Sequence, residues 1–352
     1  GNPVFREYPE NLCSSVSLKC ESYTFKLKPK EYWVSELRRD PILRRWVTIA
    51  HQPAKDKKEN CPFCSGNESY TPPEVFALRE EGTSPNTPGW QVRVISNRYP
   101  LFRLEGGLGK RAEGMYDLMN SFGAHEIVIE TPEHLQTWPQ MDICQLRKII
   151  KAYRHRCLDL RGNTRFRQII ISKHHGVPPS PSPYHQHSHV VAMPVIPLRI
   201  EEEIKGILEY YQRKDRCGYC DVISQELEDQ KRVILETKEF LSFAPFASRY
   251  PYENWIIPKQ HLSDFGLITD SQVTDLANVL KFIFTRIHKA FPDAIISMVL
   301  HSTPIQEYFQ KEYHWHFELR PRQERPVGFE WGTGFFINFV SPEKAAATIR
   351  EA

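Results

Sequence analysis

The chain has 352 residues, of which 40% are hydrophobic and 25% are charged, and its formal net charge is +3 with histidine neutral. This composition is typical of a globular protein with room for two ordinary domains or one large duplicated one. The weak positive charge forms no basic stripe, which argues against a nucleic-acid partner. No run approaches the roughly 18 apolar residues that span a bilayer, and an apolar signal region is missing, so we expect a cytoplasmic protein without a membrane partner.

Residues 1–34 show no regular pattern and are predicted to be an irregular leader. After it, strand-like runs rich in β-branched residues occur together with segments of helical periodicity. The predicted strands are 92–96, 126–130, 168–172, 190–195, 239–243, 255–258, 295–301 and 315–320. The predicted helices are 143–160, 200–213, 273–291 after the caps Asp270 and Ser271, and a terminal helix opened by Ser341 and Pro342. Hairpins are as frequent as crossovers, which predicts an α+β fold with mainly antiparallel sheets and flanking helices.

Four landmarks occur twice in the same order along the chain. Each set consists of a Cys-x-x-Cys pair, an Arg-Tyr-Pro turn, a histidine after a strand and a His-x-His pair. The first set lies at 61–64, 98–100, 134 and 185–187, and the second lies at 217–220, 249–251, 261 and 314–316. Such a repeated order is typical of a duplicated chain. We therefore predict two related halves, 35–198 and 199–352, and place the catalytic histidine in the first.

The two Cys-x-x-Cys pairs indicate metal sites, because cysteines in a reducing compartment clamp metals more often than they form disulfides. Zinc prefers a tetrahedron of thiolate and imidazole ligands, and the repeat supplies two such sets, both closed to water and therefore structural. The sets are Cys61, Cys64, His134 and His185, and Cys217, Cys220, His261 and His314. For the second site, the alternative set is His301, His314 and His316 with a carboxylate from 201–203, which would hold iron or another metal. For any single histidine, the alternative is a hydrogen-bonded core residue.

His185, His187 and His189 alternate along a predicted strand, so their side chains point to one face of it. The proline-rich stretch 177–183 leads into them as a loop. With His185 held by metal, His187 projects into the adjacent site, where an imidazole can attack phosphorus and leave again. A backbone carbonyl that accepts from the other ring nitrogen would fix the reactive tautomer. The alternative interpretation is a metal-binding histidine tract without catalysis.

Further motifs accompany this histidine cluster. They are Glu-Leu-Arg-Arg-Asp-Pro at 36–41, Arg-Trp-Val at 45–47, Val-Arg-Val-Ile-Ser-Asn at 92–97, Pro-Glu-His at 132–134, Ala-Pro-Phe-Ala at 244–247, Trp-Ile-Ile-Pro-Lys at 255–259 and Gly-Phe-Glu-Trp-Gly-Thr-Gly at 328–334. From Ser35 to its C-terminus, the chain resembles the galactose-1-phosphate uridylyltransferase family of the histidine-triad superfamily, and its last motifs look closest to the ADP-glucose phosphorylase members. The resemblance implies duplicated histidine-triad-like halves and a ping-pong transfer through a nucleotidyl-histidine at His187.

The resemblance also implies partners and residue roles. The partners are a nucleotide sugar and a sugar 1-phosphate or phosphate, the cofactor is zinc, and a homodimer is compatible with the family. Arg38 and Arg39 would approach the nucleotide phosphates, Asn97 would lie near the nucleoside, Ser182 would donate to a phosphate oxygen, and Glu330 would contact sugar hydroxyls. The alternative for the two arginines is a solvated surface pair.

Two positions depart from the family pattern. His189 stands where the family has a Gln that contacts the transferred phosphate, and His174 stands where it has an Asn. A histidine can be protonated near neutral pH, so His189 would stabilise phosphate charge or pass a proton to an acceptor. Hydrolases of the superfamily carry a histidine at this place, which keeps a nucleotide hydrolase or a dinucleotide phosphorylase open as the alternative function. A zinc-scaffolded binding protein without catalysis is a further alternative, against which the presence of His187 and Ser182 argues.

Overall fold

The computed structural model describes residues 35–50, 61–134, 136–176, 185–307, 309–322 and 327–352. Residues 34–352 form one compact unit, and the predicted leader lies outside the described residues. The strands are β1 (Glu36–Arg39), β2 (Trp46–Ile49), β3 (Glu74–Arg79), β4 (Trp90–Ser96), β5 (Arg111–Glu113), β6 (Tyr116–Asn120), β7 (Ala124–Ile129), β8 (Gln168–His175), β9 (His187–Met193), β10 (Val233–Glu236), β11 (Phe240–Phe243), β12 (Asn254–Pro258), β13 (Ile295–His301) and β14 (His316–Arg322). The helices are α1 (Ile143–Arg161), α2 (Leu198–Lys214), α3 (Gly218–Asp229), α4 (Asp270–Ala290), α5 (Gly328–Thr333) and α6 (Pro342–Glu351), with short 3-10 helices at Glu68–Tyr70 and Phe265–Leu267.

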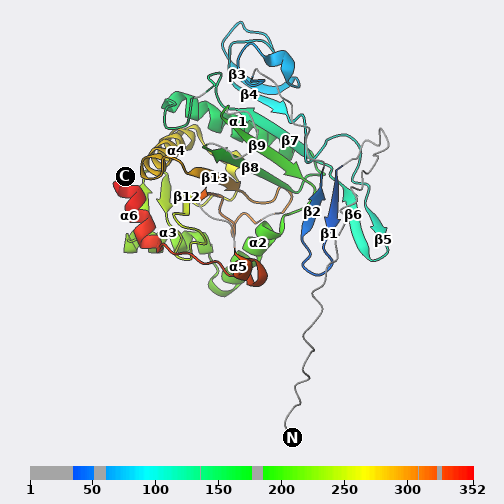
Figure 1. Cartoon of the computed structure of the whole chain (residues 1–352). Helices are drawn as coiled ribbons and strands as arrows, with labels where there is room; N and C mark the ends of the chain where they lie inside the picture. Colours follow the sequence, from blue (N-terminus) through cyan, green and yellow to red (C-terminus); the bar gives the residue numbers. More distant parts are fainter. Residues whose placement is uncertain (1–34, 51–60, 135, 177–184, 308, 323–326) are drawn as a thin grey trace, which may run out of the picture. The chain divides into compact units, whose positions relative to one another are not determined.

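Ten of these strands form one antiparallel sheet within the compact unit (Figure 1). Its spatial order is β10-β11-β12-β14-β13-β8-β9-β7-β4-β3. Read from either edge to the centre, the two halves have the same arrangement, and they join where β8 pairs with β13. The predicted α+β fold, with two duplicated halves and mainly antiparallel sheets, is therefore confirmed. The boundary between residues 198 and 199 stays a prediction, because both halves share this sheet and one compact unit.

Helices α1, α4 and α6 pack on one face of the large sheet. The first two occupy equivalent places, because each follows the third strand of its half and leads into the fourth. Buried side chains such as Ile149, Leu280 and Ile349 join a single hydrophobic core with Val128 and Val190 of the sheet. Burial of this much apolar surface is the main stabilising contribution to the unit.

The helix boundaries mostly agree with the sequence pattern. The start of α4 differs from the prediction, because Thr269 is the cap and forms a capping box with Gln272. Asp270 and Ser271 therefore lie in the first turn of the helix instead of preceding it. Ser341 caps α6, as predicted. Among the described helices, none is both long and apolar enough to cross a membrane.

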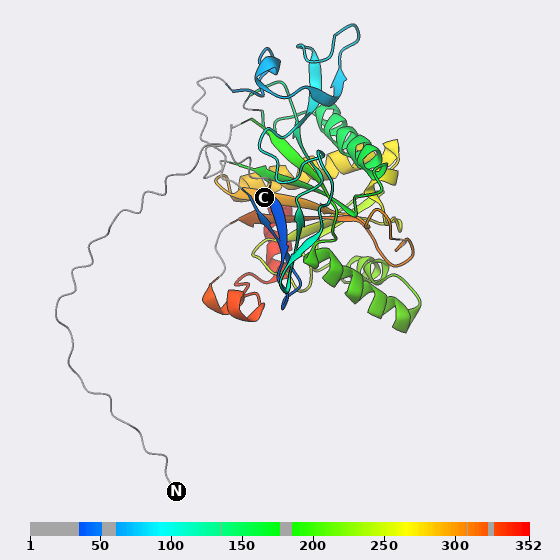
Figure 2. The same cartoon turned by 90° about the vertical axis from the view of Figure 1, so that its right-hand side faces the viewer.

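The opposite face of the large sheet carries α2 and α3 over the second half and a small four-stranded sheet over the first. In Figure 2, α1 and the green α2 lie on opposite sides of the large sheet. The small sheet has the order β2-β1-β6-β5 and packs Leu37 and Met119 against Val191 and Met193 of β9. Because side chains alternate along a strand, the histidines of β9 point to this second face, away from α1 and α4.

Candidate active site and metal clusters

The structure brings Cys61, Cys64, His134 and His185 together, with one ligand atom of each within 4.8 Å of the others. The Sγ of Cys64 lies 3.3 Å from Nδ1 of His134 and 3.7 Å from Nδ1 of His185. Two sulfurs and two imidazole nitrogens are the ligand set that tetrahedral zinc prefers. Burial, followed by the charge of Cys61, raises the pKa of the Cys64 thiol to about 11, so a bound cation is what would favour its thiolate form.

The ring of His185 is oriented by the end of β7. Its Nε2 lies 2.6 Å from the carbonyl oxygen of Thr131. A carbonyl only accepts hydrogen bonds, so the ring proton is on Nε2 and the lone pair of Nδ1 faces the two cysteines. Fixing a ligand by a hydrogen bond to its second ring nitrogen is the usual way in which proteins orient metal-binding histidines.

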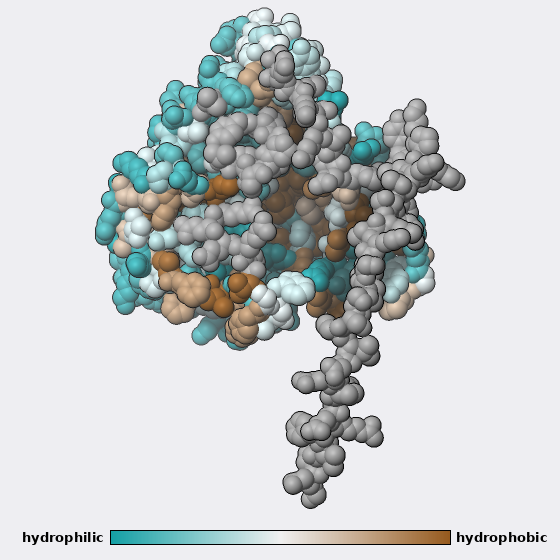
Figure 3. Space-filling view, viewed as in Figure 1, coloured by the Kyte–Doolittle hydropathy of each residue, from teal (hydrophilic) through white to brown (hydrophobic). Residues whose placement is uncertain are grey.

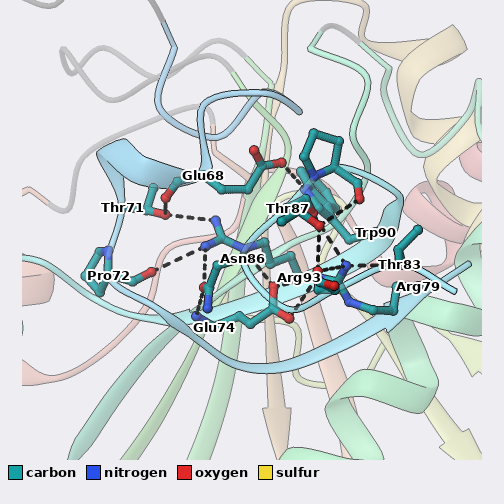
Figure 4. Close-up of polar contacts among 12 residues, drawn as sticks. Glu68, Thr71, Pro72, Glu74, Arg79, Thr83, Asn86, Thr87, Trp90 and Arg93 are labelled. Atoms are coloured by element: carbon teal, nitrogen blue, oxygen red, sulfur yellow. Dashed lines mark hydrogen bonds and ion pairs between the residues drawn. The ribbon is translucent and has the colours of Figure 1, made fainter.

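A buried polar network ties the segment after Cys64 to β3 and β4 (Figure 4). Arg93 of β4 is only 1% exposed and donates to Thr71 Oγ1 at 2.8 Å. Its guanidinium also pairs with Glu74 at 3.2 Å, and Glu68 accepts from the indole N–H of Trp90 at 2.6 Å. Hydrogen bonds that satisfy buried groups are costly to break, so this network anchors the first Cys-x-x-Cys turn to the sheet.

Cys217, Cys220, His261 and His314 form a second group of the same ligand types, also within 4.8 Å of one another. The Sγ of Cys220 lies 3.3 Å from Nδ1 of His261 and 3.8 Å from Nδ1 of His314. His261 donates from Nε2 to the carbonyl of Gln310 at 2.7 Å, which leaves its Nδ1 available to a metal. Here the Cys-x-x-Cys pair lies at the start of α3, a helix that the sequence pattern did not predict.

A third group consists of Glu203, His301, His316 and Glu318. It differs from the alternative set predicted for the second site, because His314 lies with the cysteines and Glu318 takes part instead. The two groups share no residue and therefore do not compete. His301 Nδ1 lies 2.9 Å from the Glu203 carboxylate, and His301 is paired with His316 across β13 and β14.

His187 lies at the start of β9, and its ring is 5.5 Å from the ring of Phe63. Its Nδ1 donates to the carbonyl of His185 at 2.7 Å, so its Nε2 carries the free lone pair. Burial lowers the pKa of His187 to about 4, and the ring is therefore neutral near pH 7. A neutral imidazole held in one tautomer meets the chemical requirements of a nucleophile.

A buried ion pair lies behind His187 on the other face of β9. The Lys173 ammonium is 2.5 Å from the Glu130 carboxylate, and both side chains are fully buried. Lys173 also donates to Gln186 Oε1 at 3.0 Å, while Glu130 accepts from Ser188 Oγ at 2.9 Å. These two partners flank His187 in the sequence, so the ion pair fixes the strand on both sides of His187.

His189 lies next to His187, with the ring centroids 5.2 Å apart. Burial, followed by repulsion from His187, His174 and Lys173, lowers the pKa of His189 to about 3. In the free protein these surroundings favour the neutral ring, whereas the sequence leaves a protonated His189 open. Its Nδ1 is 3.0 Å from Nε2 of His125, a residue that the sequence analysis did not single out.

Asn97, expected near the nucleoside, follows β4 beside this pair of histidines. Its Nδ2 lies 3.2 Å from Nε2 of His125, and both residues line a cavity of about 660 Å³. The cavity extends along the end of α1, where Arg156 and Asp159 also line it. A cavity of this size with a few polar side chains suits a small organic ligand.

The other residues that the resemblance assigned to substrate lie apart from His187 or outside the described residues. Arg38 pairs with Glu36 at 2.5 Å, and Arg39 lies 3.9 Å from an Asp117 oxygen. In the described part of the chain, neither arginine forms a hydrogen bond or ion pair with His187. The Glu330 carboxylate accepts from two backbone N–H groups around α5, and Ser182 falls in the undescribed segment 177–184.

The sequence of the chain is similar to known proteins of one enzyme family. A sequence profile of the galactose-1-phosphate uridyl transferase C-terminal domain matches residues 203–330. The ADP-glucose phosphorylase of Arabidopsis thaliana is 33% identical over 334 residues, which cover 90% of this chain and 92% of that protein. The galactose-1-phosphate uridylyltransferase of Thermotoga maritima is 29% identical, with 90% and 98% covered.

Solved structures agree with the sequence matches. A crystal structure of the Arabidopsis thaliana ADP-glucose phosphorylase with bound ADP-glucose has 32% identity and a TM-score of 0.74, and the match covers 90% of this chain and 99% of that one. A uridylyltransferase structure has 26% identity and a TM-score of 0.77, with 90% and 97% covered. The chain therefore belongs to the galactose-1-phosphate uridylyltransferase family of nucleotidyltransferases.

Proposed function

We propose that this enzyme transfers a nucleoside monophosphate between a sugar 1-phosphate and a second phosphate acceptor through a covalent intermediate on His187. The observation that carries the proposal is the state of this ring, which is neutral, buried and held by the His185 carbonyl with Nε2 unprotonated. An imidazole in this state can form a bond to phosphorus without a separate base.

The proposed reaction has two balanced steps. In the first, His187 Nε2 attacks the α-phosphorus of a nucleotide sugar, a P–N bond forms, and the bond to the bridging oxygen breaks to release sugar 1-phosphate. In the second, an oxygen of inorganic phosphate or of another sugar 1-phosphate attacks the same phosphorus and the P–N bond breaks. The products are then a nucleoside diphosphate or a new nucleotide sugar.

The relatives supply the proposed substrate class. One relative is named for phosphorolysis of ADP-glucose, and others are named for uridylyl transfer to galactose 1-phosphate. We propose that the cavity beside Asn97 receives the nucleoside, while Arg38, Arg39 and Ser182 serve the phosphates and Glu330 serves the sugar. These roles rest on the motif resemblance and on the place of Asn97 next to the His125–His189 pair.

We propose that the two Cys₂His₂ groups each hold one zinc ion. Both offer the sulfur and nitrogen ligands that zinc prefers, and a closed set of four protein ligands is typical of a structural site. In the first group, the metal would hold His185, whose carbonyl orients the nucleophile. Bound zinc would neutralise the charge of the thiolates. It would take no part in the transfer step, in which His187 is the group that reacts with phosphorus.

A second copy of the chain is the proposed partner of the surface around α5. Large aromatic side chains gather there, and Figure 3 shows apolar side chains around this helix. The most exposed are Trp331 at 85%, Phe339 at 82% and Phe335 at 70%. Exposed apolar patches of this kind mark interaction surfaces, so we expect a homodimer. Light scattering of the purified chain, with W331A as the comparison, tests the expectation.

The function is tested by measuring products with four substrate pairs. The protein is incubated with ADP-glucose or UDP-glucose, each with inorganic phosphate or galactose 1-phosphate as the acceptor. We expect glucose 1-phosphate together with a nucleoside diphosphate or a new nucleotide sugar. Release of free nucleoside monophosphate without transfer would favour the hydrolase alternative. No turnover of either nucleotide sugar by folded, metal-containing protein would contradict the proposal.

A further inference from the structure

Two histidines on neighbouring strands, His125 of β7 and His189 of β9, are in direct contact beside the cavity. The Nε2 of His125 lies 3.0 Å from the Nδ1 of His189, and the ring centroids are 5.2 Å apart. The second ring is also the direct neighbour of His187. A hydrogen bond between two imidazoles requires one protonated and one unprotonated nitrogen, so the contact fixes the tautomer of both rings once one of them is known.

The backbone determines the tautomer of His125. The N–H of Leu101 donates to Nδ1 of His125 at 3.1 Å, so this nitrogen is unprotonated and the proton of the neutral ring is on Nε2. The Asn97 atom that lies near Nε2 is the amide nitrogen Nδ2 at 3.2 Å, which can only donate and cannot accept that proton, whereas Nδ1 of His189 at 3.0 Å can accept it. The Nε2–H of His125 therefore donates to Nδ1 of His189. The proton of the neutral His189 ring is then on its own Nε2.

The surroundings keep both rings uncharged. Burial is the first cause that lowers the pKa of His125 to about 4 and the pKa of His189 to about 3, and repulsion between neighbouring rings is the second. The positive charge of Lys173, which also disfavours a charged His189, is paired with Glu130. The pair of rings therefore offers a directed N–H dipole to the site without a net charge.

We propose that His125 is a positioning residue, which holds His189 in the Nε2–H tautomer so that His189 donates a hydrogen bond to the phosphate transferred by His187. The inference rests on the proposed transfer function. A free imidazole exchanges its proton between the two nitrogens, and the Nδ1–H form would present a lone pair to the phosphate oxygens, which repel it. His125 removes that form by offering a donor to Nδ1. His125 and His189 together thereby supply a neutral N–H donor, as the amide of a glutamine at position 189 would do alone.

The tautomer can be measured without any substrate. Imidazole ¹⁵N chemical shifts and their couplings to ring protons distinguish Nε2–H, Nδ1–H and charged rings in protein labelled with ¹⁵N-histidine. The signals of His189 are identified by their loss in H189Q. We expect the Nε2–H form in the natural protein, a mixture of both forms in H125F, and a return to Nε2–H in H125Q, whose amide N–H replaces the lost donor.

A merely structural role of His125 would leave the tautomer of His189 unchanged in H125F. An unchanged tautomer there, or an Nδ1–H or charged His189 in the natural protein at neutral pH, would overturn the proposal. Because this measurement needs no turnover, it decides whether His125 fixes the tautomer of His189 even where the proposed function fails.

A kinetic cycle tests whether His125 acts through His189. The rate of adduct formation on His187 is measured with ADP-glucose in the natural protein, H125F, H189Q and the double variant. An amide has no tautomer to fix, so we expect H125F to slow adduct formation about tenfold in the natural background and to have little effect in the H189Q background. Equal slowing in both backgrounds would overturn the proposal. If the natural protein forms no adduct from ADP-glucose or from UDP-glucose, the proposed function fails, and the ¹⁵N measurement alone decides the role of His125.

Discussion

The carbonyl of His185 accepts the Nδ1–H of His187 at 2.7 Å, so one residue serves both a candidate metal cluster and the proposed nucleophile. The ring of His185 turns its Nδ1 to the cysteines, while its backbone selects the reactive tautomer of the next histidine but one. The residues for metal binding and for the proposed transfer therefore lie next to each other in the short segment from His185 to His187. Loss of metal from this cluster is therefore expected to disturb the chemistry, whereas loss of the nucleophile is not expected to disturb the metal.

H187A should abolish turnover, by at least about a thousandfold, because it removes the unprotonated Nε2 that is proposed to form the bond to phosphorus. The metal content and the melting temperature should stay close to those of the natural protein. The matched control is H288A, which removes an exposed histidine on α4. Steady-state rates and metal analysis of the three proteins check the prediction, and full activity in H187A would refute the assignment.

C61S should cost one metal ion per chain and lower the melting temperature by about 5–10 °C, because a structural site contributes folding free energy. Turnover should also fall, by about tenfold or more, because His185 would lose the metal that holds it and its carbonyl would then orient His187 less well.

C217S is the matched comparison for C61S, because it removes the equivalent ligand of the second cluster and should spare more of the activity. C144S, at an exposed cysteine, should change neither property. Metal analysis that finds no metal in natural protein purified without chelators would contradict the account of both clusters.

Much of the fold was predictable because it rests on local patterns. The strand 295–301 and the helices over 143–160 and 200–213 have clear periodicity, and the structure places an element at each. Several of the elements missed were short or masked by other signals. The start of α3 coincides with the second Cys-x-x-Cys pair, which was interpreted only as a metal clamp. Strands β1, β5 and β6 have no more than five residues and gain their stability from pairing in the small sheet, which local pattern does not show.

The site was predictable only where its residues lie together in sequence or repeat. The spacing of His185, His187 and His189 and the duplicated landmarks led directly to the two candidate Cys₂His₂ groups that the structure assembles. His125 was missed because its role depends on the register between β7 and β9, a long-range property. The charge of His189 could not be predicted for a related reason, since burial lowers its pKa and burial follows from packing.

Buried histidines should make the fold sensitive to acid. Burial lowers the pKa of His175 from 6.5 to about 3, and this side chain is 4% exposed. The unfolded chain therefore binds a proton that the folded chain does not, so the stability from His175 is present above pH 6.5 and is lost as the pH falls toward 3. Between pH 7 and pH 5 this residue should account for about 2 kcal/mol of the loss. Urea unfolding of H175L should show a loss smaller by that amount, and an equal loss in both proteins would contradict the prediction.

The buried Lys173–Glu130 pair should affect the free energy of unfolding more than the binding of substrate. K173M leaves the Glu130 charge buried without its cation, which should lower the free energy of unfolding by about 3–5 kcal/mol. Replacing both partners, as K173M with E130Q, should recover part of this loss because no unpaired charge remains. Chemical denaturation of the four proteins measures the coupling. Additive losses in the double variant would show that the two side chains do not act as a pair.

The identity of His189 should matter little for the fate of the adduct. A neutral histidine and a glutamine both donate one hydrogen bond without adding charge, so H189Q should leave the partition between water and a phosphate acceptor within about twofold of the natural value. H189L removes the donor and should slow adduct formation about a hundredfold. Partition is measured by chasing the isolated adduct with galactose 1-phosphate in water. A clear rise in transfer over hydrolysis in H189Q would favour a proton-shuttling His189 and the hydrolase alternative.

The covalent role of His187 is tested most directly by intact-protein mass spectrometry after a short incubation with ADP-glucose or UDP-glucose in the absence of an acceptor. We expect a mass increase of one nucleoside monophosphate, located on His187 by peptide mapping, absent from H187A and discharged when phosphate or galactose 1-phosphate is added. Turnover of the same nucleotide sugar with no adduct on His187, or with the adduct on another residue, would contradict it.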